Sequence, residues 1–284
     1  MKRIILIVLS LWCVVIAASA KLPVQVKKST AFLFLRDSNR VLIPSGTGFF
    51  IQVNAQQNND TVRFGYLVTS KHALRMMNGT LSESLYVRID RKDGLSDTLL
   101  VPLTVNGVRR YAVHTDSTVD LAVLPAFPDA ARYDFLFTPY AMIAPEDFVN
   151  RFGIVEGDEV FYTGMLASQP GVLKNAPAVR TATFLQFSDE KYRTLAGWTE
   201  GYLLDASFTP GMSGAPLYYY APADSISGRP SATFLLAGIV SGAFPNNTTN
   251  GQFLIVTPAY KLFEVLNQPF LTEERNKEFL KLRK

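Results

Sequence analysis

A succession of short, apolar and β-prone segments, separated by turn residues, restricts the possible folds of this chain more than any other feature. Residues 30–36 form the first segment, and Asp37-Ser38-Asn39-Arg40 behind it has the composition of a turn. Such runs, bounded by Gly, Pro, Asn and Asp, are typical of strands and the turns that join them. The other predicted strands cover 41–43, 49–53, 62–69, 85–89, 99–105, 121–124, 159–162, 181–187, 201–204, 216–220, 234–240 and 253–256. This pattern predicts an all-β protein built from sandwiches or barrels.

A Pro- and Ala-rich connection, residues 125–145, divides the predicted strands into two sets. We therefore predict two β-barrels, an N-terminal one in residues 21–130 and a C-terminal one in residues 131–258. Helices are expected at the end of the chain, where residues 259–284 would form short helices and a basic tail. Thr257 is expected to cap, and Pro258 to begin, a helix that ends at Leu266.

The first twenty residues have the composition of a secretory signal peptide. Lys2 and Arg3 precede an apolar run over 4–17, and Ala18-Ser19-Ala20 fits the small-residue cleavage pattern. The run is shorter than the roughly 20 residues of a membrane span, so we expect no stable membrane insertion after cleavage. An uncleaved anchor is the alternative. Cys13 is the single cysteine, so the exported chain has no disulfide, which fits the periplasm or surface of a bacterium better than an animal extracellular fluid.

The charge and the scarcity of metal-binding side chains exclude several functions. The formal charge of +4 falls to +2 when Lys2 and Arg3 are removed, so a nucleic-acid partner gains no support. Two histidines and no cysteine in the exported chain leave mainly carboxylates as ligands, so we expect no metal site and no cofactor.

A glycine-flanked serine is the strongest candidate for chemistry. Residues 205–217 contain Gly211-Met212-Ser213-Gly214, preceded by Pro210. Glycine permits backbone angles that other residues avoid, so the segment is expected to form a tight turn that exposes Ser213. The N–H groups of Gly211 and Ser213 would then form an oxyanion hole for an attacked carbonyl group. A purely structural turn is the alternative, because such compositions are common.

An activated serine needs a base and a group that orients this base. His72 lies at the exit of an apolar strand, whereas His114 has a polar neighbourhood and is expected to be structural. Asp120 opens a strongly apolar strand, and a buried carboxylate there needs a charged partner such as His72. Asp116 is the lesser alternative.

The order His, Asp, Ser along the chain discriminates between hydrolase types. An α/β-hydrolase needs its histidine after the nucleophile, and none follows Ser213. A subtilisin-type order would need an aspartate before His72 and a helix after Ser213, but the segment 217–220 is β-prone.

In these segments the chain resembles the trypsin-like serine peptidases of the chymotrypsin fold, and is similar to the bacterial Deg/HtrA catalytic domain. Gly46-Thr47-Gly48-Phe49 resembles an early Gly-Ser-Gly-Phe strand, and residues 67–74 resemble the family's LTxxHV segment. Residues 120–124 resemble DLALL, and residues 205–217 resemble DAxxxPGNSGGPL. Residues 238–242 give a weaker match to the strand that pairs with bound peptide.

The resemblance implies two six-stranded antiparallel β-barrels with the site between them. It makes Ser213 the nucleophile, His72 the general base, and Asp120 the group that orients His72. Gly211 and Ser213 would form the oxyanion hole, and Ser241 would donate a hydrogen bond to Asp120. The substrate-binding residues would be Ser207, Val240, Ser241, Gly242 and Ala243.

The chain departs from the family pattern at Met212 and Ala215, where the family has Asn or Asp and a glycine. Without Asp before the nucleophile, activation by an ion pair to a freed N-terminus is excluded. We also expect a catalytic domain without a PDZ module.

These observations predict an exported serine endopeptidase that acts on protein or peptide substrates. The neutral Ser207 at the pocket base, and Ala243 at its entrance, predict small to medium apolar side chains before the scissile bond. The alternatives are a catalytically inactive trypsin-like fold that serves as a binding module, and an esterase-like acyl hydrolase.

Overall fold

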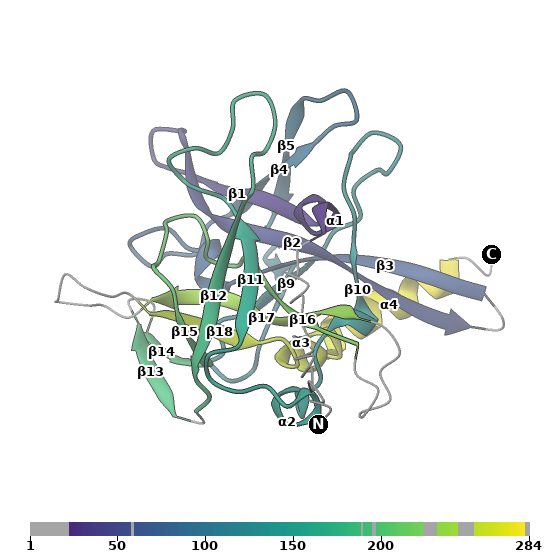
Figure 1. The fold of residues 1–284 in the computed structure, drawn as a ribbon. Coiled ribbons are helices and arrows are strands. Elements are labelled where there is room, and N and C mark those ends of the chain that lie inside the picture. Colours follow the sequence, from purple (N-terminus) through teal and green to yellow (C-terminus); the bar gives the residue numbers. More distant parts are fainter. Residues whose placement is uncertain are drawn as a thin grey trace, which may run out of the picture.

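The computed structural model describes residues 23–57, 60–188, 190–194, 197–223, 232–243 and 253–281. The predicted signal segment 1–20 lies outside these residues. The described chain folds into two large, mainly antiparallel sheets and two small hairpins, with the first large sheet drawn in purple and blue above the teal-to-yellow strands of the second (Figure 1). Within this part of the chain, no helix has the length and apolar character needed to cross a membrane.

The first sheet has the strand order β5-β4-β1-β2-β3-β9-β8, and β10 pairs in parallel with β2. In β4, buried and partly buried residues alternate, so every second side chain enters the core. The elements are α1 (Val24–Lys28), β1 (Thr30–Arg36), β2 (Leu42–Gln57), β3 (Asp60–Thr69), β4 (Ser84–Asp90), β5 (Ser96–Pro102), β8 (Ala112–Val113), β9 (Ala122–Pro125) and β10 (Thr138–Pro139). A small separate hairpin contains β6 (Thr104–Val105) and β7 (Val108–Arg109).

The second sheet closes into a six-stranded barrel in the order β11-β12-β15-β18-β17-β16. Its strands are β11 (Glu159–Gly164), β12 (Ala178–Gln186), β15 (Tyr202–Asp205), β16 (Pro216–Ala221), β17 (Thr233–Ala243) and β18 (Leu254–Pro258). The barrel interior is filled by aromatic and aliphatic side chains such as Tyr162, Phe184 and Leu217, which are all at most 1% exposed. Closure leaves no unpaired sheet edge around this interior.

The predicted all-β fold in two halves is confirmed, although the first half forms an eight-stranded sheet where a six-stranded barrel was predicted. The second sheet is a closed barrel, whereas no ladder joins β5 to β8 in the described part of the first sheet. Residues 133–137 extend the first half, because Phe135 and Phe137 pack on Phe50 in its core.

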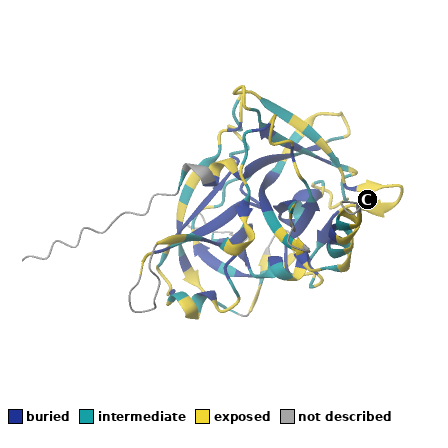
Figure 2. Ribbon diagram, turned by 90° about the vertical axis from the view of Figure 1, so that its right-hand side faces the viewer, coloured by how far each residue is buried: buried dark blue, intermediate teal, exposed yellow. Residues whose placement is uncertain are grey.

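The two halves share a third core. It combines Phe49 and Val68 of the first sheet with Tyr218 and Ile239 of the barrel, and Leu262 of the C-terminal helices closes it. Figure 2 shows the same distribution, with buried strands in the middle of the molecule and exposed residues on loops and outer hairpins. The shared core fixes the halves against each other and so fixes any site between them.

The C-terminal helices are α3 (Lys261–Leu266) and α4 (Pro269–Lys281), and a short helix α2 (Phe148–Phe152) precedes the barrel. The predicted helix start at Thr257 and Pro258 is wrong, because both residues pair with β17 as the end of β18. Pro269 begins α4, where its missing N–H costs nothing. The buried Arg275 holds α4 on β3 through hydrogen bonds to the Tyr66 hydroxyl and the Leu266 carbonyl.

Candidate active site

His72 lies in a short 3-10 helix, Lys71–Leu74, directly after β3. The next two residues, Ala73 and Leu74, are buried, and Leu74 packs in the core of the first sheet. The imidazole points away from that core, and 31% of its surface is exposed. The apolar strand and its buried exit therefore hold a histidine at the boundary between core and solvent.

Asp120 contacts His72 twice. The Nδ1 atom of His72 donates to the Oδ2 atom of Asp120 at 2.6 Å, and the backbone N–H of His72 donates to Oδ1 at 3.0 Å. The carboxylate is buried between Val119 and Leu121, which are both fully buried. Because a carboxylate only accepts hydrogen bonds, Nδ1 carries the proton and Nε2 is left as the free acceptor.

Burial and charge act against each other in this pair. Burial alone raises the pKa of Asp120, but attraction to His72 and the two hydrogen bonds outweigh it and hold the pKa below 3.8. Burial likewise lowers the pKa of His72, but attraction to Asp120 and its hydrogen bond outweigh that effect and raise the pKa above 6.5. The pair is therefore a stronger proton acceptor than an isolated histidine.

The other two candidates, Asp116 and His114, lie in the loop before Asp120 and have structural roles there. Asp116 accepts hydrogen bonds from the backbone and hydroxyl groups of Thr118 at 2.8 and 2.7 Å, which lower its pKa to about 2. The buried His114 receives the Asp116 N–H on Nδ1 and donates from Nε2 to Glu264 on α3 at 2.9 Å. Asp116 and His114 therefore belong to the support of the loop, and Asp120 is the partner of His72.

The Ser213 turn connects β15 to β16, and glycine geometry defines it. Gly211 and Gly214 have φ angles of +98° and +84°. A Cβ atom on Gly214 would lie 2.1 Å from the carbonyl oxygen of Thr47, so this position requires glycine. Gly214 also donates its N–H to the carbonyl of Val240 at 2.7 Å. The turn is thus fixed by backbone contacts to both halves of the molecule.

Thr47 on β2 is a residue of this site that the sequence alone did not identify. Its hydroxyl donates to the carbonyl of Gly211 at 2.6 Å and accepts the Met165 N–H at 2.9 Å. Its backbone N–H donates to the carbonyl of Ser213 at 2.7 Å. The only sequence signal was a threonine between two glycines, which is consistent with a close approach of two backbones. Thr47 therefore clamps the carbonyl groups on both sides of Met212.

Met212 is fully buried in the barrel core. A Cβ atom on Gly164 would lie 2.9 Å from its sulfur atom, so Gly164 provides the space for this side chain. The side chain of Met212, where the family pattern has a polar residue, therefore anchors the turn by packing in the barrel core.

The fold brings Ser213 and His72 to the same place without a direct bond. A Cβ atom on Gly46 would lie 2.7 Å from the carbonyl oxygen of Ser213 and 3.2 Å from Cβ of Ala73, the residue after His72. Among the hydrogen bonds of the described residues, none joins the Ser213 hydroxyl to His72. Such bonds are often long in enzymes without substrate.

The predicted bond from Ser241 to Asp120 is wrong. A β-bulge between Val240 and Gly242 directs the Ser241 hydroxyl to Thr257 Oγ1 at 2.6 Å, within the barrel. Bulges commonly redirect a side chain in this way. Gly242 and Ala243 pair with β18 at the half-buried end of β17, and Ser207 is exposed in the coil after β15.

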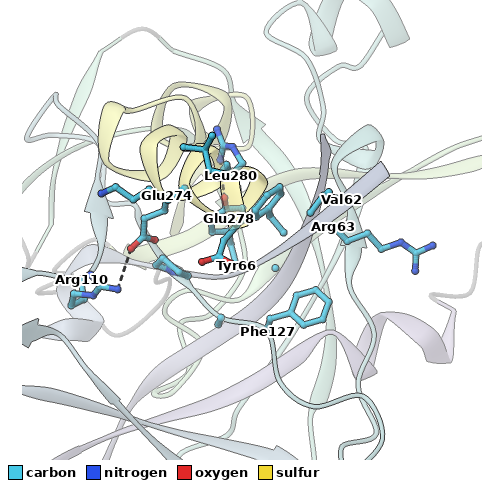
Figure 3. Close-up of a pocket in the computed structure, with 14 residues that line it drawn as sticks. Val62, Arg63, Tyr66, Arg110, Phe127, Glu274, Glu278 and Leu280 are labelled. Atoms are coloured by element: carbon cyan, nitrogen blue, oxygen red, sulfur yellow. Dashed lines mark hydrogen bonds and ion pairs between the residues drawn. The ribbon is translucent and has the colours of Figure 1, made fainter. Parts of the chain in front are cut away.

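Two hollows differ in their relation to these residues. A small one, about 70 Å³, is lined by His72, Asp120 and Trp198. A groove of about 920 Å³ runs between β3, the segment 125–127 and α4, where Arg110 forms an ion pair with Glu274 (Figure 3). No candidate catalytic residue lines this groove, so the size of a hollow does not mark the site. In the described residues, no group of three or more His, Cys, Asp or Glu side chains gathers to bind a metal ion.

Comparisons with known proteins support the fold. No protein-family model and no curated protein sequence matches this chain. The MamO protease domain from Magnetospirillum magneticum (apo form) is similar in structure, with 18% identity, a TM-score of 0.53, and coverage of 86% of this chain and 98% of that one. The active form of the Rv3671c protease from M. tuberculosis gives 15% identity, a TM-score of 0.46 and coverage of 85% and 80%. A structure of HBP has 14% identity and a TM-score of 0.47, and the match covers 88% of this chain and 96% of that one. The similarity to the MamO protease domain, together with the closed barrel, gives this chain the chymotrypsin-like fold of the trypsin-like proteases.

Proposed function

We propose that this chain is a serine endopeptidase that hydrolyses peptide bonds through an acyl-enzyme. The observation that carries the proposal is the 2.6 Å contact between Nδ1 of His72 and the buried Asp120. It leaves Nε2 of His72 unprotonated and strengthened as a base, on the side of the molecule where the Ser213 turn meets the first sheet.

In the first step, the Ser213 hydroxyl oxygen attacks the carbonyl carbon of the scissile peptide bond, and Nε2 of His72 takes its proton. The charge that develops on the carbonyl oxygen is stabilised by the N–H groups of Gly211 and Ser213. The positive φ of Gly211 and the clamp from Thr47 support this role, because they fix the peptide groups of the turn before substrate arrives. Asp120 stabilises the imidazolium that forms.

In the second step, His72 gives its proton to the leaving amine, and the C–N bond breaks to leave an ester on Ser213. Water then attacks the ester carbon, and His72 takes a proton from this water. The bond between this carbon and the Ser213 oxygen breaks, His72 returns the proton to that oxygen, and the acid product leaves. In both steps His72 carries the proton and the N–H groups of the turn stabilise the oxyanion, so the proposed reaction needs no metal or cofactor.

The substrate is proposed to be an extended peptide along the end of β17, with Val240, Ser241, Gly242 and Ala243 beside it. Such strand pairing recognises the backbone of the peptide more than its side chains, so it needs no distinctive side chains in residues 240–243. Ser207 would lie at the base of the pocket for the residue before the scissile bond, which would prefer small to medium apolar side chains. Export by the segment 1–20 to a periplasmic or secreted location is part of the proposal.

One observation favours a second candidate, a binding module that keeps the fold without catalysis. The Ser213 hydroxyl has no hydrogen bond to His72 in the described residues. A site that stays open in this way when substrate is bound would hold a peptide without cleaving it.

A fluorophosphonate probe separates the two candidates. The wild-type chain and Ser213→Ala are treated with the probe, and intact mass is measured. A single adduct on the wild type that is absent from Ser213→Ala supports the peptidase, and cleavage of a peptide library then identifies the preferred residues. A well-folded wild-type chain that forms no adduct contradicts the peptidase and favours the binding module.

A further inference from the structure

A hairpin outside the barrel reaches the loop that carries Asp120. Its strands are β13 (Lys191–Thr194) and β14 (Gly197–Glu200), in the connection between β12 and β15. The N–H of Glu200 donates to the carbonyl of Thr118 at 3.1 Å, and the Glu200 carboxylate lies 3.1 Å from Nζ of Lys261. These contacts hold β14 against the first half, next to the catalytic pair.

Trp198 on β14 is the unusual residue of this hairpin. Its side chain is 60% exposed, whereas the adjacent Thr199 is 3% exposed and fixes the strand in place. Large aromatic side chains lose favourable free energy when they remain in water, so an exposed indole beside a reactive site indicates a contact surface. Backbone hydrogen bonds and a buried neighbour hold Trp198 there, so its exposure is built into the fold.

The hollow beside Trp198 includes the base itself. Its volume is about 70 Å³, and its lining residues include Lys71, His72, Arg75, Thr118, Asp120 and Trp198. A general base must lie within hydrogen-bond reach of the reacting group, so the substrate residues next to the scissile bond have to pass His72. A side chain of one of these residues can therefore lie over the small hollow and against the exposed indole of Trp198.

The two cations of the hollow already have partners. Nζ of Lys71 donates to the carbonyl of Ser117 at 2.7 Å, and Nη1 of Arg75 donates to the carbonyl of Gly79 at 2.7 Å. The indole of Trp198 is the group that gains most from being covered. The hollow therefore favours an apolar or aromatic side chain over an acidic one.

We propose that Trp198 is a specificity-determining residue that binds a large apolar or aromatic side chain of the substrate, next to the residue whose bond is cleaved. This inference rests on the proposed peptidase function for its substrate class. The hairpin and the loop before Asp120 both line the hollow.

Hydrolysis of matched anilides tests the role of Trp198. The substrates are succinyl-Ala-Ala-X-Z-p-nitroanilides, where Z is the residue selected by the peptide library and X is Phe, Leu, Glu or Ala. We expect kcat/KM to be at least roughly tenfold higher for X = Phe than for X = Ala, and this ratio to approach one in Trp198→Ala. Trp198→Phe should keep most of the ratio. An equal ratio in wild type and Trp198→Ala, or a preference for X = Glu, would overturn the proposal.

Tryptophan fluorescence tests binding separately from catalysis. The chain has two tryptophans, Trp12 and Trp198, so a Trp12→Phe, Ser213→Ala chain reports on Trp198 alone. Acetyl-Ala-Ala-Phe-Z-amide should shift its emission to shorter wavelength at saturation, and the X = Ala peptide should not. A bound Phe peptide without an emission shift, with binding measured by calorimetry, contradicts the proposal. If the emission shift is observed but the chain with Ser213 intact forms no fluorophosphonate adduct, the peptidase is rejected and the Trp198 site is kept.

Discussion

The His72–Asp120 pair and the Ser213 turn reach the same site by different physical means. The pair depends on charge and hydrogen bonds between side chains, held in place by buried neighbours such as Val119 and Leu121. The turn depends on backbone conformation and packing, with φ of +84° at Gly214 and a fully buried Met212 below it.

This difference determines how each part fails. An isosteric change in the pair leaves the shape intact and removes a charge, so it should affect rate and pH dependence more than stability. A change in the turn adds atoms where the two halves meet, so it should affect stability first. Thr47 combines the two kinds of interaction, because its side-chain hydroxyl holds the backbone of the turn against the first sheet.

Asp120→Asn tests the pair and should have the largest effect on rate. Asparagine keeps the shape but offers an amide that favours the wrong tautomer of His72, so we expect kcat to fall by about 10⁴-fold. Asp116→Asn is the matched control, because Asp116 bonds to Thr118 and not to His72. Steady-state kinetics of both variants test this comparison. Equal losses in the two variants would show that Asp120 acts only through the structure of the loop.

Gly214→Ala tests the turn. Its Cβ atom would lie 2.1 Å from the Thr47 carbonyl in addition to the strain of a positive φ, so we expect the free energy of unfolding to fall by roughly 3 kcal/mol or more. Gly94→Ala is the control, since Gly94 has φ of +86° and no atom within 4 Å of the added Cβ. Strain alone should cost Gly94→Ala about 1 kcal/mol. Urea unfolding of both variants gives the difference, and equal costs would disprove steric contact as the reason.

Thr47→Val tests the link between the two regions. Valine keeps the shape and removes the hydrogen bond to the Gly211 carbonyl, so the oxyanion turn should loosen and kcat fall about tenfold with KM nearly unchanged. Thr47→Ser keeps the hydroxyl and should restore most of kcat. A parallel fall of kcat in both variants would contradict the hydroxyl as the cause, because Thr47→Ser keeps it.

The pH dependence of kcat/KM and of stability should show the smallest effect, and it tests the His72–Asp120 pair most directly. Because the pKa of His72 is raised above 6.5, kcat/KM should rise with pH along a limb centred above 6.5, where His72 becomes neutral. The raised pKa of His72 also stabilises the folded chain. This contribution to the free energy of unfolding is complete below pH 6.5 and is lost as the pH rises through the pKa of His72 in the folded chain. The stability gained from Asp120 is lost instead as pH falls through its lowered pKa, below 3.8.

Proton NMR titration measures this shift directly. The chain has two histidines, so His114→Gln leaves the His72 resonance alone. In Asp120→Asn the titration of His72 should move to lower pH, because the attraction of the carboxylate is lost while burial remains. An unchanged titration would remove Asp120 as the cause of the raised pKa.

Local signals in the sequence predicted much of this architecture. Residues 30–36 match β1, and the predicted strands at 62–69 and 216–220 lie within β3 and β16. The pairing of His72 with Asp120 was also predicted, because an acid that opens an apolar strand needs a charged partner. The hairpin β13–β14 was missed, since its short polar strands differ little from a loop until β14 meets the Thr118 carbonyl.

The sequence by itself determined the strands, the glycine-flanked turn and the residue types of the site, because alternation, glycine and scarce histidine act over a few residues. Only the tertiary structure decided what meets across the two halves. It joined Thr47 to Gly211, turned Ser241 to Thr257 through a bulge, and set Trp198 beside His72. Such contacts depend on register and on a shared core between segments far apart in the chain, and no local pattern encodes them.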